Sequence, residues 1–144
     1  MPLSKNIRQR KNELRAVYRR LRTNCPKDVK RELDRKLTEK FLSLDEYKKC
    51  RTLFAFVSTP IEVDTSKIIE TALKDGKRLA VPKCIDKTGL MDFYFIDSTD
   101  CLKKGSFSIM EPDEEICEKV TDFSDGLCLV PGLCFDYQGY RLGF

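Results

Sequence analysis

The chain has 144 residues, 41% of them hydrophobic and 35% charged, which suits one compact, soluble domain and excludes an intrinsically disordered chain. No apolar run approaches the roughly 18 to 20 residues of a membrane span, and the basic N-terminus lacks the apolar segment of a secretory signal. Residues 1–44 hold 14 Lys and Arg against 5 Asp and Glu, a net charge of +9, whereas residues 45–144 hold 13 against 18, a net charge of −5. This asymmetry predicts an anionic partner such as nucleic acid, a phosphate or a polycarboxylate.

The cysteine and histidine counts limit the possible chemistry. The chain has seven Cys and no His. An odd number of Cys with no C-x-x-C spacing argues against a disulfide framework or a zinc site, and favours reduced cysteines in a cytoplasmic protein. Without His, Ser–His and Cys–His nucleophiles are excluded. Catalysis would therefore depend on carboxylates, Lys, Arg, Tyr, backbone amides or a hard metal ion.

Two amphipathic helices are predicted at the N-terminus. The first covers residues 5–22, with apolar side chains at helical spacing: Ile7, Leu14, Val17 and Leu21. Asn24 and Cys25 interrupt this pattern, and Pro26 suits the first turn of a second helix. Apolar residues recur every four positions along that helix: Val29, Leu33, Leu37 and Phe41. We expect both helices to pack on the sheet that follows.

Four strands are predicted after the helices. The continuous apolar run 52–57 suits a strand buried on both faces of a parallel sheet. A helix from Asp64 or Thr65 to Asp75-Gly76 leads to a short strand at 79–81, closed by Pro82, and such a unit needs a right-handed crossover. Further strands are expected at 91–96 and 127–130, and loops with a short helix at 101–122. The predicted fold is α/β, a Rossmann-like three-layer domain over residues 1–144 with a mostly parallel central sheet flanked by helices.

Three groups of residues have the composition of a binding site. Residues 139–144 place two glycines around an Arg, as in an oxyanion-binding loop, although an ordinary surface loop has the same composition. Lys11 and Arg15 project from one helix face and either grip a polyphosphate or belong to a solvated basic face. Glu62 follows the strand at 52–57, at the edge where open α/β sheets bind ligands. It either binds the N–H groups of a heterocycle or is an exposed acid of the loop or of the next helix.

Taken in chain order, these segments resemble the 5-formyltetrahydrofolate cyclo-ligase family. Each motif is weak alone, but their ordered combination is specific and covers essentially the whole chain. The matching motifs are K-x-x-x-R at Lys11–Arg15, a loop at 58–65 with its acid at Glu62, Val81-Pro82, Met91-Asp92-Phe93, the P-G-x-x-F-D segment at 131–136, and Arg141-Leu142-Gly143-Phe144.

The resemblance implies an activity and a set of site residues. The implied reaction is ATP-dependent cyclisation of 5-formyltetrahydrofolate to 5,10-methenyltetrahydrofolate through phosphorylation of the formyl oxygen, with Mg²⁺ as cofactor. By position, the resemblance implies that Lys11 and Arg15 hold the ATP phosphates. It also implies a phosphate loop beginning at Arg141, Leu142, Gly143 and Phe144, with Arg141 catalytic. Glu62 would orient the pterin and Val57 would line its pocket.

The family pattern continues past Phe144 through further glycines, a Tyr-Tyr-Asp, a strand and a helix. We therefore expect a fragment or a truncated variant with impaired activity, and no metal ligand within this chain, because the family's magnesium-binding Asp would lie beyond Phe144. The alternatives are a non-catalytic nucleotide- or folate-binding remnant and a basic nucleic-acid-binding protein. Nucleic acid is disfavoured because Phe54, Phe56, Phe93 and Phe95 sit in core-like strands. The expected partners are a nucleotide and 5-formyltetrahydrofolate, bound by a cytoplasmic monomer.

Overall fold

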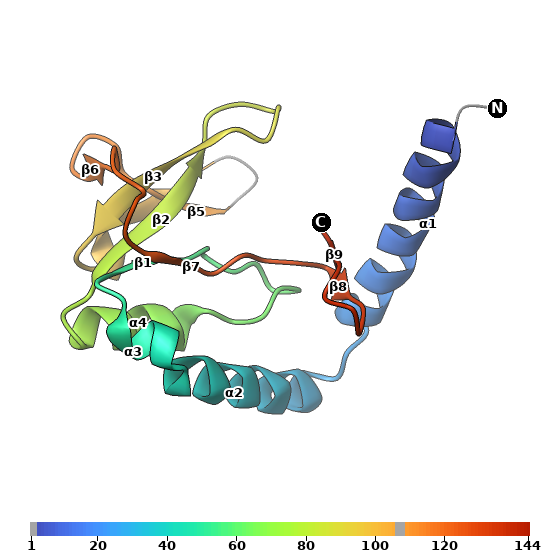
Figure 1. Cartoon of the computed structure of the whole chain (residues 1–144), viewed down its shortest axis with the longest axis horizontal. Helices are drawn as coiled ribbons and strands as arrows, with labels where there is room; N and C mark the ends of the chain where they lie inside the picture. The colour runs from blue at the N-terminus through green and yellow to red at the C-terminus, as the bar shows by residue number, and fades with distance from the viewer. Residues whose placement is uncertain (1–2, 106–108) are drawn as a thin grey trace.

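The chain forms helices and short strands around one central sheet, as the computed structural model shows (Figure 1). The structure describes residues 3–105 and 109–144. The helices are α1 (Leu3–Thr23), α2 (Lys27–Ser43), α3 (Asp45–Lys49), α4 (Ser66–Lys74) and the 3₁₀ helix η1 (Thr99–Cys101). The strands are β1 (Thr52–Phe54), β2 (Arg78–Cys84), β3 (Met91–Ile96), β4 (Leu102–Lys104), β5 (Met110–Pro112), β6 (Glu118–Lys119), β7 (Leu127–Cys128), β8 (Cys134–Phe135) and β9 (Arg141–Leu142). The α/β class is confirmed, and the strand predicted at 91–96 has the observed bounds.

The central sheet is mixed, with strand order β6-β3-β2-β1-β7. Strand β1 pairs in parallel with β2 and with β7, whereas β2–β3 and β3–β6 are antiparallel. The prediction of a mostly parallel sheet therefore holds only for the β2-β1-β7 half. The reason lies in the connections: α4 provides the crossover between β1 and β2, but the short loop 85–90 between β2 and β3 permits only an antiparallel pairing.

Strand β2 continues through Pro82, where the sequence predicted its end. The carbonyl of Ala80 accepts a hydrogen bond from the N–H of Ala55, so the backbone polar groups of Ala80 point toward β1. The backbone nitrogen of Pro82, two residues later, points in the same direction, but the pairing of β1 with β2 ends at Phe54–Ala80. No donor is needed at that position, and a proline is tolerated. The antiparallel pairing with β3 continues to Cys84.

Side chains alternate between two apolar clusters on opposite faces of the sheet. Leu53, Leu79 and Val81 pack with the helical layer of α2, α3 and α4, which lies on one side of the sheet in Figure 1. Phe54 and Ala80 point to the other face, where aromatic rings cover the sheet. In the described ranges no α-helix packs on that face, so the predicted three-layer arrangement is wrong for this part of the chain. The alternation explains how β1 and β2 bury both faces.

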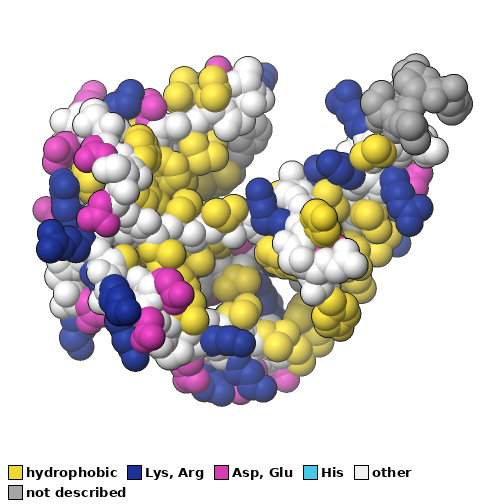
Figure 2. Space-filling view, viewed as in Figure 1, with side chains coloured by type: hydrophobic (Ala, Val, Ile, Leu, Met, Phe, Trp, Pro, Cys, Tyr) yellow, Lys and Arg dark blue, Asp and Glu magenta, His cyan; other side chains and the backbone are white. Residues whose placement is uncertain are grey.

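The prediction that both N-terminal helices pack on the sheet is wrong for α1. Helix α1 leans away from the sheet (Figure 1), and its apolar residues, from Ile7 to Leu21, are 37% to 59% exposed. Figure 2 shows hydrophobic side chains uncovered along α1. In α2, only the C-terminal Phe41 and Leu42 pack against the core. Amphipathic periodicity identifies an apolar face but does not determine what covers it. Helix α1 is held to the rest of the chain by hydrogen bonds from Arg15 and Arg22.

Several short elements differ from expectation. The strand predicted at 127–130 is β7, only two residues long. The region 101–122 begins at the last residue of η1 and contains β4, β5 and β6. The small β8–β9 sheet was not predicted from the sequence. All seven cysteines are unpaired. Among the described helices, none combines the length and the hydrophobicity that crossing a bilayer requires.

Candidate functional site

A pocket of about 320 Å³ lies beyond the carboxyl ends of β1 and β7. These two strands are parallel neighbours, so the loops that follow them leave the sheet at the same edge. The hydrogen bond from Leu129 N–H to Phe54 O (2.8 Å) extends the pairing toward this edge. One wall of the pocket comes from α2, one from the loop after β1 and one from the segment 129–144. This is the position at which open α/β sheets bind ligands.

The pocket wall is mostly apolar, with four phenylalanines and one acidic side chain, and is called the aromatic pocket below. The phenyl rings of Phe41, Phe56, Phe135 and Phe144 line it, together with aliphatic side chains. Glu62 is the one acidic residue among the described residues that line the pocket. Flat apolar walls with an acidic acceptor among few polar side chains suit a planar heterocycle that carries N–H groups. The structure thus brings two of the predicted site residues, Glu62 and Phe144, into one cavity.

The loop that carries Glu62 is closed by its own side chains. Thr65, which is 1% exposed, donates its hydroxyl to Phe56 O (2.7 Å) and its N–H to Ser58 Oγ (3.1 Å). The Glu62 Oε1 atom accepts the N–H of Thr59 at 2.9 Å. One carboxylate oxygen therefore holds the loop, which leaves Oε2 for a ligand.

Asp64, in the same loop, serves the start of α4. Its Oδ1 atom accepts the backbone N–H of Ser66 (2.9 Å) and the Ser66 hydroxyl (2.7 Å). These hydrogen bonds, the backbone one first, lower the pKa of Asp64 below its ordinary value. Asp64 is thus kept ionised and holds the first residue of α4. Glu62 is the acid that lines the pocket.

The C-terminal segment reaches the pocket through the β8–β9 sheet. Leu133 N–H donates to Leu142 O (2.8 Å), and Arg141 Nη1 donates to Pro131 O (2.7 Å). Gly139 has φ of 90°, and it lies in the turn between the two strands. That φ value favours glycine for the turn itself. Of the two glycines that flank Arg141, only Gly143 is therefore beside the site.

Gly143 is the point at which α1 meets this segment. Arg15 Nε donates to Gly143 O at 3.0 Å, and Arg15 Nη1 donates to Asn12 Oδ1 at 2.9 Å. Lys11 is exposed one helical turn earlier. In the part of the chain that the structure describes, the N–H groups of Gly143 and Phe144 donate to no other group. Arginine and unpaired backbone amides are the kinds of group that bind oxyanions. The structure brings Arg15 and Gly143, two of the predicted phosphate-binding residues, together.

Two observations differ from what the sequence suggested. Val57 does not line the pocket but packs beside the core cluster, and Phe56 lines the pocket instead. Arg22, which was not among the predicted site residues, is partly buried and bonds three backbone carbonyls around the site. Its spacing of seven from Arg15, two helical turns on one face, was the one signal that could have indicated it.

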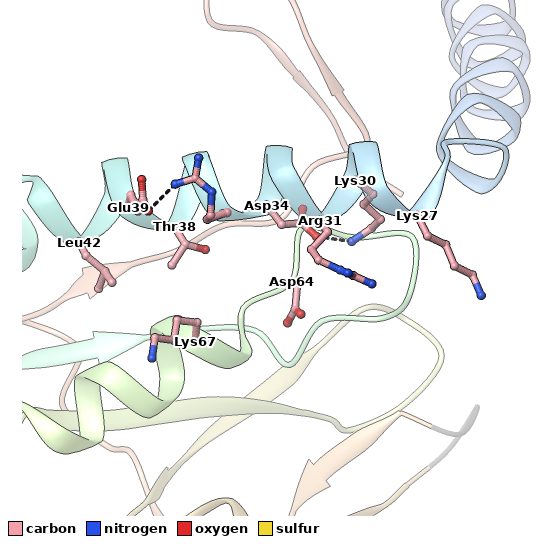
Figure 3. A pocket seen from close by; sticks show the side chains of 10 residues that line it. Lys27, Lys30, Arg31, Asp34, Thr38, Glu39, Leu42, Asp64 and Lys67 are labelled. Carbon is pink, nitrogen blue, oxygen red and sulfur yellow. Dashed lines mark hydrogen bonds and ion pairs between the residues drawn. The ribbon is translucent and has the colours of Figure 1, made fainter.

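A second, larger cavity of about 560 Å³ lies between α2 and α4. Figure 3 shows α2 above it and Asp64 and Lys67 below it. Charged side chains dominate its wall, and Lys30 and Asp34 form an ion pair there. None of the predicted site residues lines this cavity. The aromatic pocket is therefore the better candidate site.

The described residues do not fit a resident metal ion. Residues 3–105 and 109–144 contain no group of three or more His, Cys, Asp or Glu side chains that could hold one. Glu62 is alone in the pocket, and one of its oxygens is occupied by Thr59. Mg²⁺ usually needs one or two carboxylates together with substrate phosphates. The described residues therefore give no basis for assigning an Mg²⁺ site.

The fold is an α/β domain with an apolar pocket, containing Glu62, at the carboxyl edge of its sheet. Comparison with known proteins identifies the family: the model of the 5-formyltetrahydrofolate cyclo-ligase family matches residues 7–144. The chain belongs to this family. It is 30% identical to a probable 5-formyltetrahydrofolate cyclo-ligase of Schizosaccharomyces pombe over 93% of its length, and 32% identical to the 5-formyltetrahydrofolate cyclo-ligase of Mus musculus over 74%.

A solved structure gives the same family. The chain is similar to the 5,10-methenyltetrahydrofolate synthetase of Aquifex aeolicus, with a TM-score of 0.80 and 35% identity over 93% of the chain. The chain spans 66% of that protein, 67% of the S. pombe relative and 55% of the mouse relative.

Proposed function

We propose that this protein takes part in the ATP-dependent cyclisation of 5-formyltetrahydrofolate to 5,10-methenyltetrahydrofolate. The observation that supports this best is the meeting of an aromatic pocket containing Glu62 with a cationic helix at one short segment, residues 141–144. A folate needs a flat pocket with an acceptor for pterin N–H groups. ATP needs cations and backbone donors for its phosphates. Both requirements are met at adjoining places.

In this proposal the folate occupies the aromatic pocket. Glu62 Oε2 accepts pterin N–H groups while Oε1 stays on Thr59, so the loop holds the carboxylate in place before the ligand arrives. Phe56 and Phe144 provide apolar walls for the ring system. Val57 was predicted to line this pocket; it packs beside the core next to Phe56, and in this proposal it supports the pocket wall without touching the folate.

ATP in this proposal binds along α1 with its phosphates at residues 141–144. Lys11 and Arg15 supply charge, and the free N–H groups of Gly143 and Phe144 supply donors. Arg141 is held by Pro131 O, so its guanidinium lies at the junction between the two ligands. We assign to Arg141 the stabilisation of negative charge on the transferred phosphoryl group. Leu142 positions this segment through its carbonyl bond to Leu133, and Mg²⁺ enters with the ATP phosphates.

The chemistry needs positioning and charge stabilisation, and no protein nucleophile. The formyl oxygen takes the γ-phosphoryl group and ADP is released. The folate N10 then attacks the activated carbon and loses its proton, and the carbon–oxygen bond breaks to release phosphate. A chain without His is compatible with this sequence of steps.

The proposed partners are therefore small molecules, with the protein acting as a monomer in the cytoplasm. Two features argue against nucleic acid. Phe54 and Phe93 pack edge to face at 5.4 Å in an aromatic cluster, so they are not free to stack on bases. Arg22 on the basic helix is engaged by three backbone carbonyls and so is not free to contact a nucleic-acid backbone.

The test is formation of 5,10-methenyltetrahydrofolate, followed by its absorbance, from 5-formyltetrahydrofolate with ATP and Mg²⁺. We expect product and inorganic phosphate in equal amounts, and no product when a non-hydrolysable ATP analogue replaces ATP. Calorimetric titration of each ligand accompanies the assay. If neither folate nor ATP binds, the proposal is wrong. Binding of both without product would favour the non-catalytic alternative.

A further inference from the structure

The unexpected feature of the site is Arg22, near the C-terminal end of α1. All three of its guanidinium nitrogens donate hydrogen bonds to backbone carbonyls. Nε donates to Leu133 O (3.0 Å), Nη1 to Ile61 O (3.1 Å), and Nη2 to both Gly132 O (2.8 Å) and Leu133 O (2.7 Å). The same guanidinium carbon lies 5.5 Å from the centre of the Phe144 ring. One side chain thus joins α1 to three separate segments.

Each of these contacts is next to a residue that the proposed function uses. Ile61 immediately precedes Glu62, so the bond to its carbonyl fixes the backbone that carries the pterin-binding acid. Gly132 lines the aromatic pocket, and its backbone neighbour Leu133 is bonded to Leu142 in the phosphate segment. Phe144 lines the pocket and follows Gly143. Arg22 therefore contacts both the folate side and the phosphate side.

Arg15 and Arg22 act on the same segment from one helix face. They are seven residues apart, which is two helical turns and about 10.5 Å along the axis. Arg15 holds Gly143 O, and Arg22 holds the 132–133 turn and the Phe144 ring. The distance between these two anchors is set by a rigid helix. A change in the position of one anchored segment therefore changes the position of the other.

We propose that Arg22 is a positioning residue that couples the folate pocket to the ATP-phosphate segment. This inference rests on the proposed function for the identity of the ligands. In this role Arg22 touches neither substrate, but its loss weakens the binding of both. This behaviour separates it from Glu62, whose loss affects the folate alone, and from Arg15, whose loss affects ATP.

The geometry requires arginine at this position. Lysine has a single nitrogen and cannot reach carbonyls of Ile61, Gly132 and Leu133 that approach the guanidinium from different sides, whereas the planar fork of arginine can. Arg22→Lys should therefore behave like Arg22→Ala. Free guanidinium, well below denaturing concentrations, should partly restore Arg22→Ala because it can occupy the same carbonyl cage.

The experiment compares Arg22→Ala, Arg22→Lys and the matched control Arg20→Ala, an exposed arginine on the same helix. Hydrogen exchange without ligand is the first readout. In both Arg22 variants we expect amides in 58–65 and 132–144 to exchange faster while β2 keeps its protection. Calorimetry is the second readout, and losing even one charge-assisted hydrogen bond predicts affinities for 5-formyltetrahydrofolate and for ATP that each fall about tenfold or more. Arg20→Ala should match the wild type in both.

Several results would overturn this role. They are unchanged exchange in either segment, loss of affinity for only one ligand, full recovery with lysine, or an equal loss of protection in β2, which would mean a general loss of stability. The two readouts also separate this inference from the proposed function. If the wild-type chain binds neither ligand, the proposed function fails, whereas the exchange pattern still decides whether Arg22 holds the two segments together.

Discussion

Replacing Glu62 by glutamine tests the folate pocket most directly, because the structure gives the two carboxylate oxygens different tasks. Oε1 accepts the N–H of Thr59 at 2.9 Å, and Oε2 is left for the ligand. Glutamine has the same shape, so its amide oxygen can still accept from Thr59. Its NH₂ group then faces the pterin N–H groups, donor against donor. The loop should survive this change and the folate contact should not.

The size of the effect follows from the lost acceptor. Leaving buried donors unpaired costs about 1 to 3 kcal/mol, which corresponds to a loss of about 5- to 150-fold in affinity for 5-formyltetrahydrofolate. Affinity for ATP should be nearly unchanged. The stability of the loop should fall only slightly, because a neutral hydrogen bond replaces a charge-assisted one.

The assay is calorimetric titration of Glu62→Gln with each ligand, and Glu62→Ala serves as the structural control. The alanine variant loses the bond to Thr59 as well, so its hydrogen exchange at 58–65 should be faster than that of the glutamine variant. Equal losses for folate and ATP in Glu62→Gln would show that Glu62 is only a loop anchor. Folate affinity within about twofold of the wild type would remove Glu62 from the pterin site.

Two further substitutions test the nucleotide side and the core. Arg15→Ala should weaken ATP binding by about tenfold or more and leave folate binding nearly unchanged, because a charge-assisted contact beside Gly143 is lost. Arg20→Ala is the control. Equal ATP affinities of the two variants would contradict the assignment. Tyr47→Phe removes a 2.7 Å hydrogen bond to Asp75 from a side chain that is 3% exposed, and should lower the free energy of urea unfolding at neutral pH by about 1.5 to 3 kcal/mol. Burial and then Asp75 raise the pKa of Tyr47, so above about pH 10 the Tyr47 hydroxyl ionises only in the unfolded chain and the wild type should lose stability. Tyr47→Phe should lack this contribution to the decline. Parallel pH profiles of the two proteins would refute the argument.

The sequence by itself determined the elements whose signals are local. Helical spacing predicted α1 and α2 to within a few residues, and the apolar run at 91–96 predicted β3 at its observed bounds. The position of Glu62 after a buried strand predicted its place at the carboxyl edge of the sheet. These predictions succeed because periodicity and strand ends depend on neighbours within a few residues along the chain.

Only the tertiary structure decided how these elements meet. The pairing of β1 with β7 brings the Glu62 loop beside the 129–144 segment and makes one pocket from two separate motifs. It also places Phe56 in the pocket, whereas the family resemblance implied Val57, which packs beside the core. The orientation of a residue past the paired end of β1 depends on tertiary contacts. The apolar face of α1 was visible as a pattern, but its exposure depends on the direction in which the whole helix leaves the sheet.

Arg22 shows the physical reason for this division. Its carbonyl partners at Gly132 and Leu133 lie 110 and 111 residues away in sequence, and Arg15 reaches Gly143 across 128 residues. A guanidinium that bonds backbone carbonyls places no demand on the type of side chain at the other end, so the partner residues carry no mark in the sequence. Helix α1 is rich in arginine, and Arg15 and Arg22 are not distinguished from the others by residue type. They differ because the folded chain places backbone carbonyls opposite them.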